Sequence, residues 1–299
     1  MKKIIINIVS FILIKSGLIF LIEKRIFQYR SLKYENKSII PFLKRYYHFI
    51  DYFLVTIVYF KNYYSKIKNP KKQREISFST LDYGEGVKWA KHYFNENSKG
   101  NIHRKEREEI YKKTSELIIN KSLNNKKTLF INIGSSSGVD LIYFYKKFNE
   151  IVYLSSDIND EIIDFQKGLY KNHNIHYFKG PADQIAENLD AFGKKYNTEK
   201  IIIFCNGSLQ YEIPFFLNRG FENLNKAKIK FFYCMAEAFE LKFDKTDNYN
   251  KKNILWMHNY PKYILKNNLE IIWQKISKED QIYNNSINII FTNNLIRNI

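Results

Sequence analysis

Residues Thr128 to Asp157 read TLFINIGSSSGVDLIYFYKKFNEIVYLSSD, and this stretch decides the fold class. The apolar run Thr128–Ile133 predicts a buried strand, and the Gly/Ser turn after it leads directly into a helix over Val139–Phe148. A second apolar strand, Glu150–Ser155, follows, and a lone carboxylate, Asp157, stands just beyond it. A strand, a tight glycine turn, a helix and a second strand form the opening unit of a nucleotide-binding α/β domain.

Apolar runs and amphipathic segments alternate through the rest of the C-terminal half. This alternation predicts a parallel sheet with right-handed crossovers. The last two expected strands are joined by a short polar loop with no room for a crossover helix, which predicts an antiparallel pair at the end of the sheet. We expect an α/β fold, a Rossmann-like and mostly parallel sheet of seven strands with helices on both faces. Beyond residue 157, the expected strands are 175–178, 200–205, 228–234, 270–276 and 286–292, and the expected helices are 162–170, 184–196, 214–225 and 261–266.

The Gly/Ser turn and the carboxylate after the second strand are the residues that point to chemistry. In a sheet of this kind, ligands lie across the carboxyl ends of the strands. Gly134 and Gly138 let the backbone turn sharply and approach a ligand with no Cβ in the way, and the helix from Val139 offers unpaired N–H groups. Asp157 follows Gly138 by 19 residues, and a carboxylate at this place can accept both hydroxyls of a ribose.

Taken together, these residues resemble the class I S-adenosylmethionine-dependent methyltransferases over the C-terminal half of the chain. The family's first motif combines apolar residues, an acid and three glycines. This chain has Asn132 at the acidic position and Ser136 at the middle glycine, with Gly134, Ser135 and Gly138 around them. Asn132 can still form a hydrogen bond with the amino group of the methionine moiety, although without charge.

The resemblance implies S-adenosylmethionine as the cofactor and methyl transfer as the reaction, so the protein is expected to be an enzyme. Asp157 matches the ribose-binding acid, and Ile158 is placed to pack on the adenine. Ala182 and Asp183 fall in a segment similar to the third motif, where Asp183 is expected to accept from the adenine amino group. Asn206 opens the turn after the fourth strand, which is similar to the fourth motif.

Direct displacement of a methyl group needs alignment and, for an oxygen or nitrogen acceptor, a base. His258, Glu212 and Tyr211 are the candidate catalytic residues for this role. For each a structural role is the stronger reading: His258 as a packing histidine, Glu212 as a solvated acid at a helix start, and Tyr211 as a core residue. No His, Cys and Asp cluster has the spacing of a metal site, so no metal is expected.

The N-terminal region carries most of the positive charge. Residues 1–127 contain 27 Lys/Arg against 11 Asp/Glu, whereas residues 128–299 contain 21 against 19. Such a basic field suggests an anionic partner, and a membrane surface is favoured over nucleic acid because the C-terminal half shows no basic stripe. The alternative is a solvated, Lys-rich helical extension.

Residues 4–22, IIINIVSFILIKSGLIFLI, are long enough for one membrane anchor, although Lys15 stands in the middle. A buried or interfacial helix is the alternative. Lys and Arg residues after this segment would keep the rest of the chain on the cytoplasmic side. We expect three parts: an apolar and basic helical extension over 1–74, a helical lead-in over 75–127 and the methyltransferase-like domain over 128–299.

The two cysteines, Cys205 and Cys234, fall in apolar strands, which fits a reducing compartment and a cytoplasmic location. The apolar and basic N-terminus suggests a membrane-associated acceptor, such as a lipid-linked or saccharide intermediate, and another small molecule is the alternative. The sequence leaves the acceptor atom and the oligomeric state open.

Two other functions fit parts of the pattern. The turn also matches Gly-x-Ser-x-Gly, the nucleophile elbow of an α/β-hydrolase, with Ser136 as nucleophile and His258 as the late histidine. The region before Thr128 shows no strands of the kind that precede an elbow, and Asp157 has no role in a hydrolase. A non-catalytic, membrane-tethered cofactor-binding module is the second alternative, and Asn132 is its main support.

Overall fold

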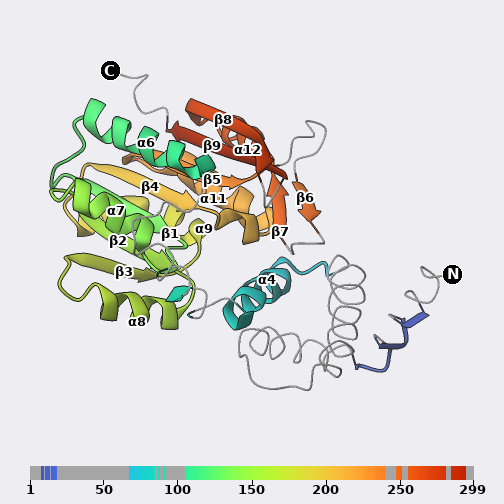
Figure 1. Ribbon diagram of the computed structural model, residues 1–299. Helices are drawn as coiled ribbons and strands as arrows, with labels where there is room; N and C mark the ends of the chain where they lie inside the picture. The colour runs from blue at the N-terminus through green and yellow to red at the C-terminus, as the bar shows by residue number, and fades with distance from the viewer. Residues whose placement is uncertain are drawn as a thin grey trace. The chain divides into compact units, whose positions relative to one another are not determined.

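The computed structural model describes residues 8–9, 11–13, 15–18, 67–84, 87, 90–91, 94, 105–239, 247–250, 255–280 and 284–293 (Figure 1). The chain divides into two compact units, Met1–Lys88 with Tyr249–Leu255 and Trp89–Asn248 with Trp256–Ile299. In the first unit, helix α4 spans Pro70–Gly84. Its first residue is a proline, which suits a helix start because the missing N–H would have no helical partner there.

A seven-stranded sheet forms the centre of the second unit (Figure 1). The strand order is β3-β2-β1-β4-β5-β9-β8, in which β1 to β5 run parallel and β9 is antiparallel to both β5 and β8. The first strand of the sheet, β1, lies in its middle. The chain continues outward through β2 to β3 and then crosses to β4 on the other side of β1, so a switch point lies between β1 and β4. The strands are β1 Thr128–Ile133, β2 Val152–Asp157, β3 Ile175–Lys179, β4 Lys200–Asn206, β5 Lys230–Ala238, β8 Glu270–Asp280 and β9 Asn284–Thr292.

Helices cover both faces of this sheet (Figure 1). Side chains of α6 and α7 pack on one face, those of α9 to α12 pack on the other, and α8 contacts β2 and β3. The helices are α6 Lys105–Asn120, α7 Val139–Lys147, α8 Asp160–Leu169, α9 Ala182–Glu187, α10 Leu189–Lys195, α11 Pro214–Lys226 and α12 Tyr260–Lys266.

Strand β1 is buried over its whole length because both of its faces are covered. Its alternating side chains supply two separate cores: Leu129 and Ile131 face α9 to α12, whereas Phe130 faces α6 and α7. On that second face, Phe130 packs against two further rings, with its centroid 4.8 Å from Phe144 of α7 and 6.0 Å from Phe204 of β4, and those two rings are themselves 5.0 Å apart. This aromatic core holds α6 and α7 against the sheet.

The predicted fold class, a mostly parallel α/β sheet of seven strands that ends in an antiparallel pair, is confirmed. Residues 184–196, expected as one helix, form two helices that meet at Asn188. The Asn188 side chain donates to the Gln184 carbonyl at 2.8 Å, a local bond that competes with the helical pattern. The polar region after β5, expected to be irregular, contains β6 Asp247–Asn250 and β7 Leu255–His258, which pair with each other.

Among the residues that the structure describes, no helix combines the length and apolar character needed to cross a bilayer. The predicted anchor over 4–22 lies partly outside the described residues. Ile8, Phe11 and Ile12, which are described, expose 53%, 62% and 55% of their surface. The anchor and the predicted domain boundaries at 74 and 127 stay predictions.

Substitution of Phe130 by Ala tests the aromatic core. The side chain is fully buried, so its loss should lower the free energy of unfolding by about 3–5 kcal/mol in urea denaturation. Phe215→Ala is the matched control, because Phe215 is 58% exposed, and its cost should stay within about 0.5 kcal/mol. Equal effects of the two substitutions would contradict the assignment of Phe130 to the core.

Candidate functional site

The Gly/Ser turn between β1 and α7 has a backbone that requires glycine at two places. Gly134, Ser136 and Gly138 have φ values of 59°, 48° and 76°, all in the left-handed region. A Cβ on Gly134 would lie 2.1 Å from Oγ of Ser208, which belongs to the turn after β4. A Cβ on Gly138 would lie 2.6 Å from the ring of Tyr170. The turn is therefore packed tightly on both sides.

Two side chains from the α8 region hold this turn in place. The amide nitrogen of Gln166 donates to Oγ of Ser135 at 2.7 Å and to the carbonyl of Ser136 at 2.6 Å. The hydroxyl of Tyr170 donates to the carbonyl of Ser137 at 2.8 Å. Gln166 is 1% exposed, so these bonds form away from water, where an unmade bond is costly.

Asp157 at the end of β2 closes the turn from the other side. Its Oδ2 accepts from the N–H of Ser136 at 3.1 Å, and its Oδ1 accepts from the N–H of Asn159 at 3.1 Å. The residue is 6% exposed, and the next residue, Ile158, is half-buried. The predicted ribose acid thus lies directly against the predicted glycine turn, as the spacing of 19 residues anticipated.

Asn132 and Asn206 lie on one face of the sheet at the ends of β1 and β4. Asn132 pairs with Phe204 in register, and its Nδ2 donates to the Phe204 carbonyl at 3.3 Å. Asn206 is two residues further along β4 and so shares that face. Among the described residues, Oδ1 of Asn132 and Oδ1 of Asn206 are both buried and have no hydrogen-bond partner. Two orphaned acceptors at the switch point indicate a place for a donor.

A carboxylate and a phenol adjoin these two amides. The hydroxyl of Tyr111, from α6, donates to Oδ1 of Asp140 in the first turn of α7. Nδ2 of Asn206 bridges the pair, at 3.3 Å from Oδ2 of Asp140 and 3.3 Å from the Tyr111 oxygen. Asp140 is 8% exposed and Tyr111 is 6% exposed. The N-terminus of α7 favours a negative charge at Asp140.

Glu237, near the end of β5, holds the turn after β4. Its Oε1 accepts from the N–H groups of Ser208 at 3.0 Å and Leu209 at 3.1 Å, and its Oε2 accepts from that of Gln210 at 3.3 Å. The Cys205 thiol also donates to it, at 3.1 Å. Burial and the negative charge of Glu237 raise the pKa of the Cys205 thiol, which favours the protonated thiol over the thiolate.

His258 is fully buried and uses both ring nitrogens. Nδ1 is 2.5 Å from Oδ1 of Asp247, and Nε2 is 3.0 Å from the carbonyl oxygen of Glu212, which can only accept. The Tyr263 hydroxyl also donates to Asp247, at 2.8 Å to Oδ2. Burial and the charge of Asp247 raise the pKa of Tyr263. In this arrangement, neither nitrogen of His258 is available to take a proton from a substrate.

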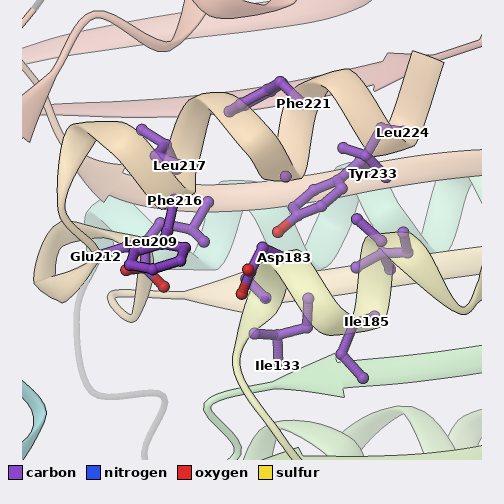
Figure 2. A pocket seen from close by; sticks show the side chains of 14 residues that line it. Ile133, Asp183, Ile185, Leu209, Glu212, Phe216, Leu217, Phe221, Leu224 and Tyr233 are labelled. Atoms are coloured by element: carbon purple, nitrogen blue, oxygen red, sulfur yellow. The ribbon is translucent and has the colours of Figure 1, made fainter. Parts of the chain in front are cut away.

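A small cavity lies on the other face of the sheet, between α9, α11 and the strands β1, β4 and β5 (Figure 2). Its volume is about 20 Å³, room for about one water molecule and too small for a nucleoside. Figure 2 shows oxygen atoms of Asp183, Glu212 and Tyr233 among the apolar side chains that line it. Ala182 also lines this cavity. Burial raises the pKa of the Tyr233 hydroxyl.

The structure therefore separates the predicted site residues into two groups. Around the turn it brings together Asn132, Gly134, Ser135, Ser136, Gly138, Asp157, Ile158 and Asn206. Ala182, Asp183 and Glu212 line the small cavity, where Glu212 adjoins His258, and the half-buried Tyr211 ends a short 3₁₀ turn, Leu209–Tyr211. Glu212, expected as a solvated acid, is 3% exposed, since the segment packs under α11.

Sequence reasoning missed the residues that hold the site together: Tyr111, Asp140, Gln166, Tyr170, Glu237 and Asp247. For Glu237 a signal existed, since it is a lone carboxylate in the apolar strand β5. Asp140 follows Gly138 by two residues, so its place directly after the turn was also a signal. Within the described part of the chain, no three His, Cys, Asp or Glu side chains gather in a way that could hold a metal ion.

The strand order, with its switch point between β1 and β4 and its antiparallel last pair, is that of a Rossmann-like α/β sheet. No protein-family model and no curated protein matches the chain.

Several solved structures are similar to part of the chain at very low identity. A 1,6-didemethyltoxoflavin-N1-methyltransferase from Burkholderia thailandensis, solved with S-adenosylhomocysteine, is 9% identical over 76% of this chain and 91% of its own, with a TM-score of 0.47. A SAM-dependent methyltransferase from Anabaena variabilis is 11% identical over 60% and 83%, with a TM-score of 0.42. A protein described as a pericyclic reaction enzyme is 10% identical over 56% of this chain, with a TM-score of 0.39, and the match spans 43% of its length.

Substitution of Gly134 by Ala tests the contact between the turns after β1 and β4. The left-handed backbone alone should cost about 1–2 kcal/mol, and the overlap with Ser208 should add to it. The Gly134→Ala/Ser208→Gly double variant should recover the part of the cost that comes from the overlap with Ser208. Urea denaturation of the wild type, the two single variants and the double variant measures this part as a coupling energy.

Gly168→Ala is the matched control, since this helical glycine has no atom within 4 Å of an added Cβ. Alanine there should leave the stability unchanged or raise it by up to about 1 kcal/mol. Additive effects of Gly134→Ala and Ser208→Gly would show that the two turns do not press on each other.

Proposed function

We propose that this protein is an S-adenosylmethionine-dependent methyltransferase. The observation that carries the proposal is the left-handed Gly134–Gly138 turn, which ends at the N-terminus of α7 and whose Ser136 N–H is bound by Asp157. A turn of this form brings the backbone close to a ligand, while the acid from the neighbouring strand end lies beside it. A carboxylate offers about four acceptor positions. Asp157 can therefore accept from the backbone N–H groups that it already binds and also from the two hydroxyls of a ribose.

The residues at the strand ends fit this cofactor. S-adenosylmethionine supplies an electrophilic methyl group, so the protein has mainly to bind, align and exclude water. The orphaned amide oxygens of Asn132 and Asn206 suit a ligand that carries hydrogen-bond donors. We assign the adenosine to the Asp157 side of the turn, next to Ile158, and the amino-acid end to the Asn132 side, near β4.

The hydrolase alternative is less well supported by the same geometry. A nucleophilic serine needs a base within hydrogen-bond reach. Oγ of Ser136 is buried without a partner among the described residues, and the ring nitrogens of His258 are bonded to Asp247 and to the Glu212 carbonyl. A non-catalytic module with the same pocket remains the second alternative, and it predicts cofactor binding without turnover.

The catalytic roles of His258, Glu212 and Tyr211 stay predictions. If His258 acts as a base, its bonds to Asp247 and to the Glu212 carbonyl have to open first. If Asp183 contacts adenine, it has to leave the cavity that it lines. Structural roles for His258 and Glu212, as links between the turn after β4 and the segment before α12, account for the observed contacts with no rearrangement.

Isothermal titration with S-adenosylmethionine and S-adenosylhomocysteine tests the proposal. The wild-type chain should bind both ligands. Asp157→Asn should raise the Kd of each by about tenfold or more, because the amide lacks the charge and one of the two acceptor oxygens of the carboxylate.

The matched control is Asp160→Asn, three residues further on, where the carboxylate is 66% exposed and pairs with Lys179. That variant should bind like the wild type. The absence of any binding by the wild-type chain would sink the proposal, and binding with no methyl transfer to any acceptor offered would favour the non-catalytic module.

For the acceptor, we propose a small molecule held at a membrane surface, such as a lipid-linked or saccharide intermediate. Support comes from the positive charge of residues 1–127 and from the exposed side chains of Ile8, Phe11 and Ile12, which fall on one side of a helix together with Lys15. An exposed apolar stripe with a basic residue suits an anionic bilayer surface.

Sedimentation with vesicles tests the membrane part. The full-length chain should co-sediment with anionic vesicles, less so at high salt, and the Ile8→Ser/Phe11→Ser/Ile12→Ser variant should bind several-fold more weakly. Neutral phosphatidylcholine vesicles serve as the control for charge. Equal binding of the wild type and the triple variant would remove the support for a membrane-held acceptor.

A further inference from the structure

Three side chains at the ends of β1 and β4 and at the start of α7, those of Asn132, Asn206 and Asp140, have the composition of a cation subsite. We infer that Asp140, together with the amide oxygens of Asn132 and Asn206, binds the primary ammonium group of the cofactor's amino-acid end. This inference rests on the proposed function and gives a role to a residue outside the glycine motif. In the first motif of the family that the chain resembles, the acid expected to bind this amino group stands at the place of Asn132, which is uncharged.

The orientation of both amides is set by their partners. Nδ2 of Asn132 faces the Phe204 carbonyl, and Nδ2 of Asn206 faces Oδ2 of Asp140 and the oxygen of Tyr111. A flip of either amide would place oxygen against an acceptor oxygen, so the two Oδ1 atoms are fixed as acceptors. Both are buried and, within the described part of the chain, lack a donor.

The register places the two asparagines on one face of the sheet, on the neighbouring strands β1 and β4, and Asp140 contacts the second of them. Asn132 spans from β1 to the Phe204 carbonyl of β4, and Asn206 follows Phe204 by two residues, a distance of about 7 Å along a strand. Asp140 contacts the Asn206 amide directly. An ammonium group has three N–H donors and no acceptor, so two amide oxygens and one carboxylate complement it in number and in charge.

Tyr111 is the positioning residue in this arrangement. Its hydroxyl donates to Oδ1 of Asp140, and its ring stacks on Phe144 with centroids 5.6 Å apart. Because Tyr111 belongs to α6, the helix before β1 takes part in building the subsite at the start of α7. The N-terminal end of α7 also interacts favourably with a negative charge on this carboxylate.

Two ligands that differ in their amino-acid end test the inference by isothermal titration. S-adenosylhomocysteine carries the ammonium group, and 5′-methylthioadenosine has the same adenosine and thioether without it. Asp140→Asn should raise the Kd of S-adenosylhomocysteine by about 10- to 100-fold. The Kd of 5′-methylthioadenosine should stay within about twofold of its wild-type value. Tyr111→Phe keeps the aromatic ring and leaves the charge of Asp140 in place. It should therefore weaken the binding of S-adenosylhomocysteine by several-fold and leave the binding of 5′-methylthioadenosine unchanged.

The outcomes separate this inference from the proposed function. If the wild type binds neither ligand, the proposed function fails. If the wild type binds both and Asp140→Asn weakens both equally, Asp140 has a structural role and the inference is overturned. Unchanged binding of S-adenosylhomocysteine by Asp140→Asn also overturns it. Should Asp140→Asn not fold, Tyr111→Phe decides by the same comparison, since equal effects on the two ligands contradict the inference.

Discussion

The close contact between the turns that follow β1 and β4 is the constraint on which the rest of the site depends. Gly134 approaches Ser208 so closely that no side chain larger than hydrogen fits between them. Each turn is held from outside, the first by Gln166 and the second by the buried carboxylate of Glu237. Because both turns are fixed, the ends of β1 and β4 keep their spacing, as a preformed binding site requires.

The two faces of the sheet have different parts in this arrangement. On the face covered by α6 and α7, an aromatic core leads up to a polar group of Tyr111, Asp140, Asn132 and Asn206. On the other face, the apolar core surrounds Asp183 and Glu212 and leaves a cavity of about 20 Å³. The first face is therefore where we place the amino-acid end of a cofactor, and the second is mainly occupied by packing.

A substitution within a sequence motif can be offset by a residue elsewhere in the fold. Asn132 carries no charge at the end of β1, while Asp140 stands in the first turn of α7 and contacts the neighbouring Asn206. Electrostatic attraction depends on distance in space, so a carboxylate on either element can serve the same group. The same reasoning applies to Glu237, which binds N–H groups of a turn some 30 residues before it in the chain.

The sequence by itself determined the alternating strands and helices of the seven-stranded sheet, the antiparallel last pair, the Gly/Ser turn and the place of Asp157 at the end of the second strand. These features follow from local pattern: apolar periodicity, glycine where φ is positive, and the meeting of parallel strand ends at one edge. The tertiary structure decided which polar groups meet, as with Tyr111 and Asp140, Gln166 and the turn, and His258 and Asp247. Such pairs join residues whose separation varies from 11 for the histidine to 31 for Gln166 and Ser135, and no periodic pattern marks them. They arise because buried polar atoms have to find partners once packing has brought their elements together.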